Sequence, residues 1–204
     1  MKKTALIISL FIVANSVSAQ FTIGPKVGLN ISKEYFGVKG FDEDSDFRSG
    51  INIGVFGKYE INDKFDIQAE LLYSQQGFKR NIPITDNIGT IITKGYEVLS
   101  HYINIPLVSK YHPFGRIYIE AGPQVGFCLD SKISPDEYKR ITGVRGYTGY
   151  NVVDFSLVGG IGFNLGNGLS VNTRYNHGLT YTLHDSKWKN RVIQISLAYD
   201  LWSF

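Results

Sequence analysis

Apolar and polar residues alternate along most of the chain after residue 20. Alternation with a period of two indicates β-strands, because successive side chains of a strand point to opposite faces. One segment shows the pattern clearly, because its apolar face carries Phe65, Ile67, Ala69, Leu71 and Tyr73. The alternation predicts eight strands, over about residues 21–31, 51–59, 65–74, 102–111, 117–127, 153–163, 169–176 and 193–200.

The connections between these strands alternate between short and long. The short ones cover residues 61–63, 112–115 and 166–168, and the last contains Asn167-Gly168, a pair favoured in tight hairpin turns. The long ones cover about residues 32–48, 79–95, 128–149 and 178–190. Short periplasmic turns, long extracellular loops and an even strand number are typical of bacterial outer-membrane barrels. The expected fold is therefore all-β, a closed transmembrane antiparallel β-barrel of about eight strands.

The first residues have the layout of a secretory signal peptide. Lys2 and Lys3 precede a short apolar run, and the small residues Ser18 and Ala19 follow it. The run is too short for a membrane-spanning helix, which needs about 20 apolar residues. We expect a signal peptide over residues 1–19, cleaved on export, and one barrel domain over residues 20–204.

Composition narrows the class further. The 204 residues include 22 Gly, 13 Tyr and 13 Phe, which favours strands and turns over helices. Cys128 is the one cysteine, so neither an intrachain disulfide nor a thiolate metal cluster is expected. The net charge of +3 is too small to argue for nucleic acid as a partner. No motif calls for a cofactor.

A soluble lipocalin-like barrel is the structural alternative, with the apolar face inward. The polar face here is rich in Gly, Asn, Gln and Ser and poor in Lys and Glu, unlike a hydrated surface. Aromatic residues also end the apolar faces, as two interfacial girdles would require. They are Tyr59, Phe65, Tyr111, Phe163 and Tyr199 toward the short turns, and Tyr73, Phe127 and Tyr175 toward the loops. Both features favour the membrane barrel.

Five stretches carry a family resemblance: residues 28–30 (GLN), 68–77 (QAELLYSQQG), 105–107 (IPL), 120–124 (EAGPQ) and 174–179 (RYNHGL). With them the chain resembles the PorT-type outer-membrane β-barrels of Bacteroidota. The resemblance implies the barrel fold and the cell outer membrane as location. The member that gave the family its name belongs to the type IX protein secretion system. A non-enzymatic envelope component that assists type IX secretion is therefore the expected function.

The end of the chain departs from the usual pattern of such barrels. The apolar phase of the last strand runs from Ile193 to Leu201, whereas Trp202 and Phe204 lie on the opposite phase. Two explanations stay open. A β-bulge near Asp200 shifts the register, or residues 202–204 form a short periplasmic tail.

Charged residues on the polar face are expected to meet in the lumen. They are Lys26, Lys58, Glu70, Glu120 and Arg174. We interpret them as a polar network that fills the barrel, because eight strands leave no open channel and buried charges need partners of opposite sign. An acid/base pair of Glu70 and Glu120 is the enzymatic alternative, but nothing in the sequence sets a specific geometry for it.

Two other function classes remain as alternatives. A lipid A-modifying hydrolase or acyltransferase needs a His and a Ser at the outer rim, and His177 is the nearest candidate. The sequence His184-Asp185-Ser186 is better explained as a solvated loop, because triads assemble in space rather than from sequence neighbours. A loop-mediated binding or adhesion protein is the other class.

The expected partners follow from this location. They are outer-membrane lipid and lipopolysaccharide, the barrel-insertion machinery and secretion-system proteins. Arg140 and Arg145 in the third long loop are candidates for contacts with lipopolysaccharide phosphates, because arginine pairs well with phosphate. No metal site is expected.

Overall fold

The computed structural model describes residues 21–36, 45–85, 91–134, 150–182 and 187–204. The expected signal peptide, the loop residues Arg140 and Arg145, and the segment 183–186 lie outside the described residues. Within the described ranges, no helix has the length and apolar character needed to cross a membrane.

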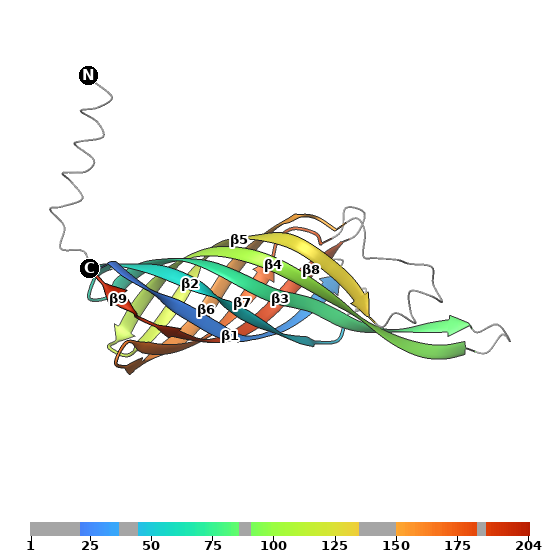
Figure 1. Ribbon diagram of the computed structural model, residues 1–204, viewed down its shortest axis with the longest axis horizontal. Coiled ribbons are helices and arrows are strands. Elements are labelled where there is room, and N and C mark those ends of the chain that lie inside the picture. The colour runs from blue at the N-terminus through green and yellow to red at the C-terminus, as the bar shows by residue number, and fades with distance from the viewer. Residues whose placement is uncertain (1–20, 37–44, 86–90, 135–149, 183–186) are drawn as a thin grey trace, which may run out of the picture.

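Eight long antiparallel strands form a closed ring (Figure 1). Each strand pairs with the next one in the sequence, and the eighth pairs with the first. This bears out the all-β barrel expected from the alternation. The strands are β1 (Phe21–Phe36), β2 (Arg48–Asn62), β3 (Phe65–Thr85), β4 (Ile91–Phe114), β5 (Ile117–Ser134), β6 (Val153–Gly166), β7 (Leu169–Gly178) and β8 (Trp188–Tyr199), followed by the two-residue β9 (Trp202–Ser203).

The turns gather at one end of the barrel, which we name the turn end. Two residues separate β2 from β3, β4 from β5 and β6 from β7. Asn167 and Gly168 both have positive φ, 52° and 78°, as a type I′ hairpin turn requires. The opposite end, the loop end, carries the longer connections.

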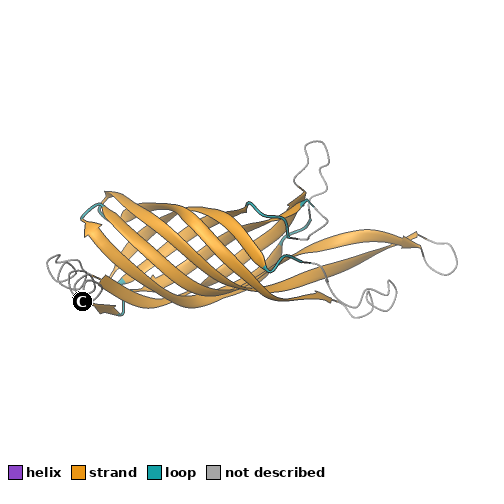
Figure 2. Ribbon diagram, turned by 90° about the horizontal axis from the view of Figure 1, so that it is seen from above, coloured by secondary structure: helices purple, strands orange, loops and turns teal. Residues whose placement is uncertain are grey.

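The β3–β4 hairpin corrects one expectation. Residues 79–95 are expected to be a loop, but β3 and β4 stay paired as far as Thr85 and Ile91. The hairpin therefore projects beyond the rest of the barrel (Figure 2). Similarly, β5 continues to Ser134 rather than ending near residue 127. The sequence signal fails here because a strand that leaves the apolar layer no longer alternates between apolar and polar faces.

The seam between the first and last strands contains a register shift. Lys26 pairs with Ala198, but Ile23 pairs with Trp202, so one extra residue lies on the C-terminal side. The backbone N–H of Leu201 donates to the carbonyl of Ile23, and that of Phe204 donates to the carbonyl of Phe21. The C-terminus thus continues the sheet through a bulge, which answers the question that the sequence left open in favour of the bulge.

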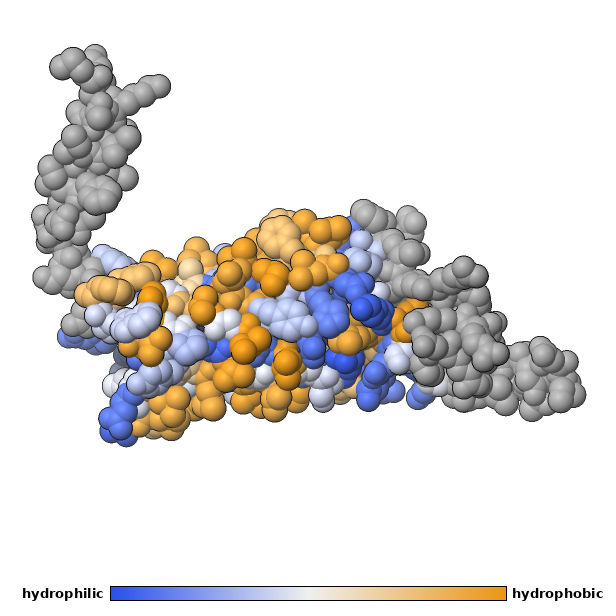
Figure 3. Space-filling view, viewed as in Figure 1, coloured by the Kyte–Doolittle hydropathy of each residue, from blue (hydrophilic) through white to orange (hydrophobic). Residues whose placement is uncertain are grey.

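The barrel is apolar outside and polar inside. Large apolar side chains such as Leu29, Ile53 and Leu157 are exposed on the outer surface, where they form a broad band (Figure 3). Most buried side chains of the described residues are amides, hydroxyls or charged groups. A soluble barrel would have the reverse arrangement, so this surface fits lipid rather than water.

Aromatic side chains border the apolar band. At the turn end, Tyr59, Phe65, Phe163 and Tyr199 are exposed, and the rings of Phe65 and Tyr111 stack with centroids 4.9 Å apart. Toward the loop end, Phe127 and Tyr175 are exposed, while the hydroxyl of Tyr73 lies 2.6 Å from Nδ1 of His101. The bulge adds Trp202 to the turn-end group, where it is 61% exposed.

Candidate functional site

A cluster of charged side chains crosses the middle of the lumen. The guanidinium of Arg174 donates to both oxygens of Glu70, at 2.6 and 2.7 Å. It also donates to both oxygens of Glu120, at 2.5 and 2.8 Å. The ammonium of Lys26 donates to Glu70 from 3.1 and 3.2 Å. Arg174 therefore joins two carboxylates that would otherwise repel each other.

The four members of this cluster come from alternate strands. Lys26 lies on β1, Glu70 on β3, Glu120 on β5 and Arg174 on β7. Inward side chains of a narrow barrel form layers in this way, with alternate strands contributing to the same layer. The cluster therefore links all sides of the ring, and its members are no more than 3% exposed.

Neutral amides complete the surroundings of the cluster. The side-chain amide of Asn172 donates to Glu120 from 2.7 Å, and that of Gln68 donates to Glu70. Toward the loop end, a second layer consists of hydrogen-bonded amides and hydroxyls. Asn30 donates to Ser74 from 2.9 Å, and Asn52 donates to Asn30 from 2.8 Å. Buried charges and polar groups are costly without such partners. The hydrogen bonds of these two layers therefore stabilise the folded barrel.

Lys58 is not part of the central cluster. Its ammonium lies nearer the turn end, 2.9 Å from a carboxylate oxygen of Asp200 and 3.0 Å from one of Glu60. The sequence pattern predicts Lys58 in one network with the other four residues, because it shares their inward phase. Inward phase does not give height along the barrel axis, which depends on the register between strands.

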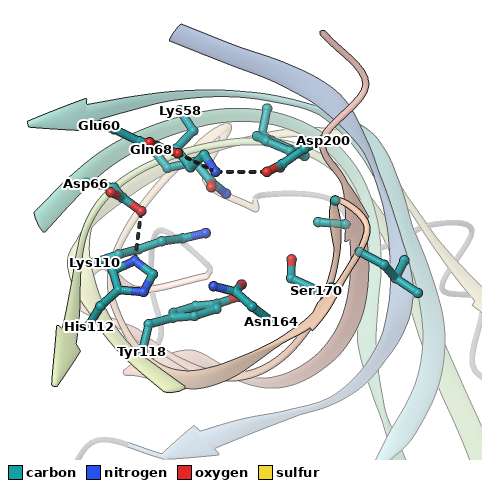
Figure 4. A pocket seen from close by; sticks show the side chains of 15 residues that line it. Lys58, Glu60, Asp66, Gln68, Lys110, His112, Tyr118, Asn164, Ser170 and Asp200 are labelled. Carbon is teal, nitrogen blue, oxygen red and sulfur yellow. Dashed lines mark hydrogen bonds and ion pairs between the residues drawn. The ribbon is translucent and has the colours of Figure 1, made fainter. Parts of the chain in front are cut away.

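A polar cavity of about 290 Å³, the vestibule, occupies the lumen at the turn end (Figure 4). Its lining includes the ion pair of Lys58 with Asp200, and a hydrogen-bond contact of 2.8 Å between Nε2 of His112 and a carboxylate oxygen of Asp66. Lys110 projects into the cavity, and its ammonium lies 4.5 Å from the centre of the Tyr118 ring. Lys110 is absent from the network expected from the sequence, although its inward phase is a signal that points to the lumen.

The loop end of the lumen is packed with apolar side chains. Phe78, Val98 and Ile133 form a buried cluster there, with Tyr96 against it. The guanidinium of Arg80 lies 4.0 Å from the ring centre of Trp188. Together with the charged cluster, this packing closes the barrel on the loop side of the vestibule.

The candidate residues for an enzyme site are His177 and the pair of Glu70 and Glu120. His177 faces outward on β7, with its ring 6.1 Å from that of Tyr175 and with no hydrogen bond to any described side chain. Glu70 and Glu120, the alternative acid/base pair, both bind Arg174. No group of three or more metal-ligating side chains occurs among the described residues.

Comparison with known proteins agrees with this architecture. A family model described as "outer membrane protein beta-barrel domain" matches residues 13–184. No curated protein matches the chain.

Solved structures give a similar result. The chain is similar to Neisserial surface protein A, with 7% identity, a TM-score of 0.57, and coverage of 88% of this chain and 97% of that one. Ail of Yersinia pestis is 13% identical, with a TM-score of 0.49 and coverage of 92% and 100%. OprG of Pseudomonas aeruginosa is 13% identical, with a TM-score of 0.46 and coverage of 91% and 96%. At 7% identity, the likeness to Neisserial surface protein A shows a shared fold and nothing further.

Proposed function

Because the chain belongs to the outer membrane protein beta-barrel domain family, we propose that it is a non-enzymatic envelope component with a closed lumen, acting by contact with other proteins. In barrels of this kind the turn end faces the periplasm and the loop end faces the medium. The observation that carries the proposal is the Arg174 cluster, which occupies the lumen from wall to wall.

The closed lumen argues against solute transport as the main activity. An eight-stranded barrel has just enough interior for its own side chains, and here these are charge-paired as well as packed. The same pairing argues against acid/base chemistry, because each carboxylate is held by a permanent cation. What remains available for function is the surface at the two ends.

The PorT-type resemblance makes assistance of type IX secretion the specific form of this proposal. The test is quantitative proteomics of the culture medium from a strain that lacks the gene, with the complemented strain as control. Loss of type IX cargo from the medium, with accumulation in the periplasm, is the expected result. An unchanged set of secreted proteins would contradict the role in type IX secretion. It would not contradict the more general proposal of a non-enzymatic envelope component with a closed lumen.

A second candidate function is binding through the loop end, and the projecting β3–β4 hairpin favours it. Paired strands give this hairpin a fixed backbone well beyond the barrel rim. Shortening it by removing residues 82–94 leaves the barrel pairing intact and should abolish any cell-surface attachment that the whole protein confers. Attachment that survives this deletion would rule out the hairpin as the binding element.

A further inference from the structure

The outer surfaces of β7, β8 and β1 change from apolar to basic at one row near the loop end. Toward that end, the outward positions of these strands carry no charge as far as Tyr175, Ile193 and Ile31. The next outward residues are His177, Arg191 and Lys33. The register makes them direct neighbours, because Arg191 pairs with His177 on one side and with Lys33 on the other. Lys189 is the next outward residue of β8, and we name these four residues the basic patch.

Aromatic rings support the cations of β8. The guanidinium of Arg191 lies 3.7 Å from the ring centre of Tyr35, and the ammonium of Lys189 lies 5.3 Å from that of Tyr181. A guanidinium that stacks on a ring keeps its N–H groups available for a planar partner such as phosphate. The Nε atom of Arg191 has no hydrogen-bond partner among the described residues.

Neighbouring carboxylates of the described chain do not face the patch. The outward positions of β7, β8 and β1 include no Asp or Glu. Glu34 belongs to β1 but is on its inward face, where it is 4% exposed, and Asp154 of β6 is also buried. Asp46 precedes β2 and forms its bridge with Lys79 of β3, on the side of β2 that lies away from β1.

Other cations of the loop end differ from those of β8. The ammonium of Lys79 lies 3.9 Å from Glu97, and that of Lys132 lies 3.1 Å from Asp130. The side chains of Lys189 and Arg191 form no ion pair with any residue that the structure describes. The sector of β3, β4 and β5 is therefore charge-paired within the chain, whereas the sector of β7, β8 and β1 presents positive charge to its surroundings.

The patch lies at the edge of the surface that fits lipid. Leu157 of β6 pairs with His177 at one end of the row, and the ring of Phe47 lies 5.1 Å from the ammonium of Lys33 at the other. Both apolar side chains are more than half exposed. Hydrophilic residues border the apolar band toward the loop end (Figure 3). Acyl chains can therefore cover the residues beside and below the row, while the cations reach the level of the headgroups.

We infer that the basic patch binds the phosphate groups of lipid A, the membrane anchor of lipopolysaccharide. Lysine and arginine form charge-assisted hydrogen bonds with phosphate, and the loop end faces the outer leaflet in barrels of this kind. Cations on adjacent strands suit a broad phosphorylated saccharide with several acyl chains better than a phospholipid with two. The inference rests on the orientation given under the proposed function and is independent of any role in secretion.

This site lies on the wall of the barrel. The sequence alone suggests contacts with lipopolysaccharide at Arg140 and Arg145, which lie outside the described residues. The wall site differs because the sheet register fixes the spacing of its cations.

Native mass spectrometry of the full barrel, released from detergent micelles, tests this inference. Three lipids are titrated: lipid A, lipid A from which the phosphates have been removed, and phosphatidylglycerol. We expect lipid A to bind most tightly, with about tenfold weaker binding once the phosphates are removed, as for the loss of a charge-assisted hydrogen bond. Equal binding of the two forms of lipid A would mean that loop carboxylates or water already satisfy these cations, and it overturns the inference. Phosphatidylglycerol that binds as tightly as lipid A overturns the choice of ligand.

The double variant Lys189→Gln with Arg191→Gln locates the site. It should bind lipid A about tenfold more weakly than the wild type. The matched control is Lys64→Gln with Arg116→Gln, which removes the same charge from two exposed residues at the turn end and should bind as the wild type does. Lys189→Gln alone should weaken binding about threefold, and it tests the site if the double variant fails to fold. Unchanged binding in the patch variants, or an equal loss in the turn-end control, refutes the assignment.

Discussion

The ring of Tyr118 occupies the space that Gly162 leaves open on the adjacent strand. The two residues are direct partners between β5 and β6. A Cβ atom added to Gly162 would lie 2.1 Å from Cζ of Tyr118. The absence of a side chain on β6 therefore allows the aromatic ring to lie across the lumen, where it forms one wall of the vestibule.

This relationship predicts that Gly162→Ala displaces Tyr118 and destabilises the barrel by about 1–3 kcal/mol, the usual cost of overpacking. The measurement is urea unfolding in detergent, followed by tryptophan fluorescence. Gly159→Ala is the control, because no atom lies within 4 Å of the Cβ that it would add. That variant should stay within about 0.5 kcal/mol of the wild type. Equal stability of the two variants would contradict the packing argument.

Arg174→Met should be among the most damaging single substitutions. It leaves Glu70 and Glu120 without their shared cation, and loss of one partner of a buried ion pair costs about 3–5 kcal/mol. Unfolding in urea measures the loss. Adding Glu120→Gln to this variant removes one unneutralised charge, so the double variant should recover about 0.5–3 kcal/mol through the coupling of the two sites. If the second substitution only adds to the damage, Glu120 does not depend on Arg174 as described.

The bulge at the seam predicts which cysteine pairs form a disulfide. In a Cys128→Ser background, Ile23→Cys with Trp202→Cys places the two thiols on directly paired residues. Directly opposite residues can meet the distance that a disulfide needs. Ile23→Cys with Leu201→Cys is the control pair, because these positions would face each other if the register continued unshifted. Gel mobility under non-reducing conditions distinguishes the two, and preferential linking of the control pair would refute the bulge.

Closure of the lumen predicts unequal reactivity of two introduced cysteines. Ser170→Cys lines the vestibule, whereas Ser196→Cys lies among the buried polar side chains, where Ser196 is 2% exposed. With Cys128→Ser as background, a charged thiol reagent should modify the first cysteine rapidly and the second only after unfolding. Mass spectrometry over time follows both reactions. Similar rates in the folded barrel would show that water and solutes pass the Arg174 cluster.

The sequence predicts the strands well because lipid on one side and a packed lumen on the other force strict alternation. The same rule places Lys26, Glu70, Glu120 and Arg174 on the inward face. It cannot give their heights along the axis, since these depend on the stagger between strands. For that reason the alternation alone predicts Lys58 among them, although it lies nearer the turn end with Asp200.

Two other features could not be read from the pattern. The outer part of the β3–β4 hairpin lies beyond the apolar layer, where both faces of a strand can meet water and alternation no longer marks it. Lys110 has no neighbour of opposite charge close in the sequence, and its contact with Tyr118 depends on the β4–β5 register. Long-range register is the information that the single sequence lacks.

The central cluster draws one residue from each of β1, β3, β5 and β7, and this has a consequence for biogenesis. An open, partly assembled sheet cannot bring Lys26 and Arg174 to the same carboxylate, because they approach each other only when β8 meets β1. Until then each charge must keep its own hydration shell, and an intermediate with these groups in hydrocarbon would be strongly disfavoured. Dehydration of the interior and closure of the ring are therefore one cooperative event, which occurs only after the last strand of the chain has been delivered to the membrane.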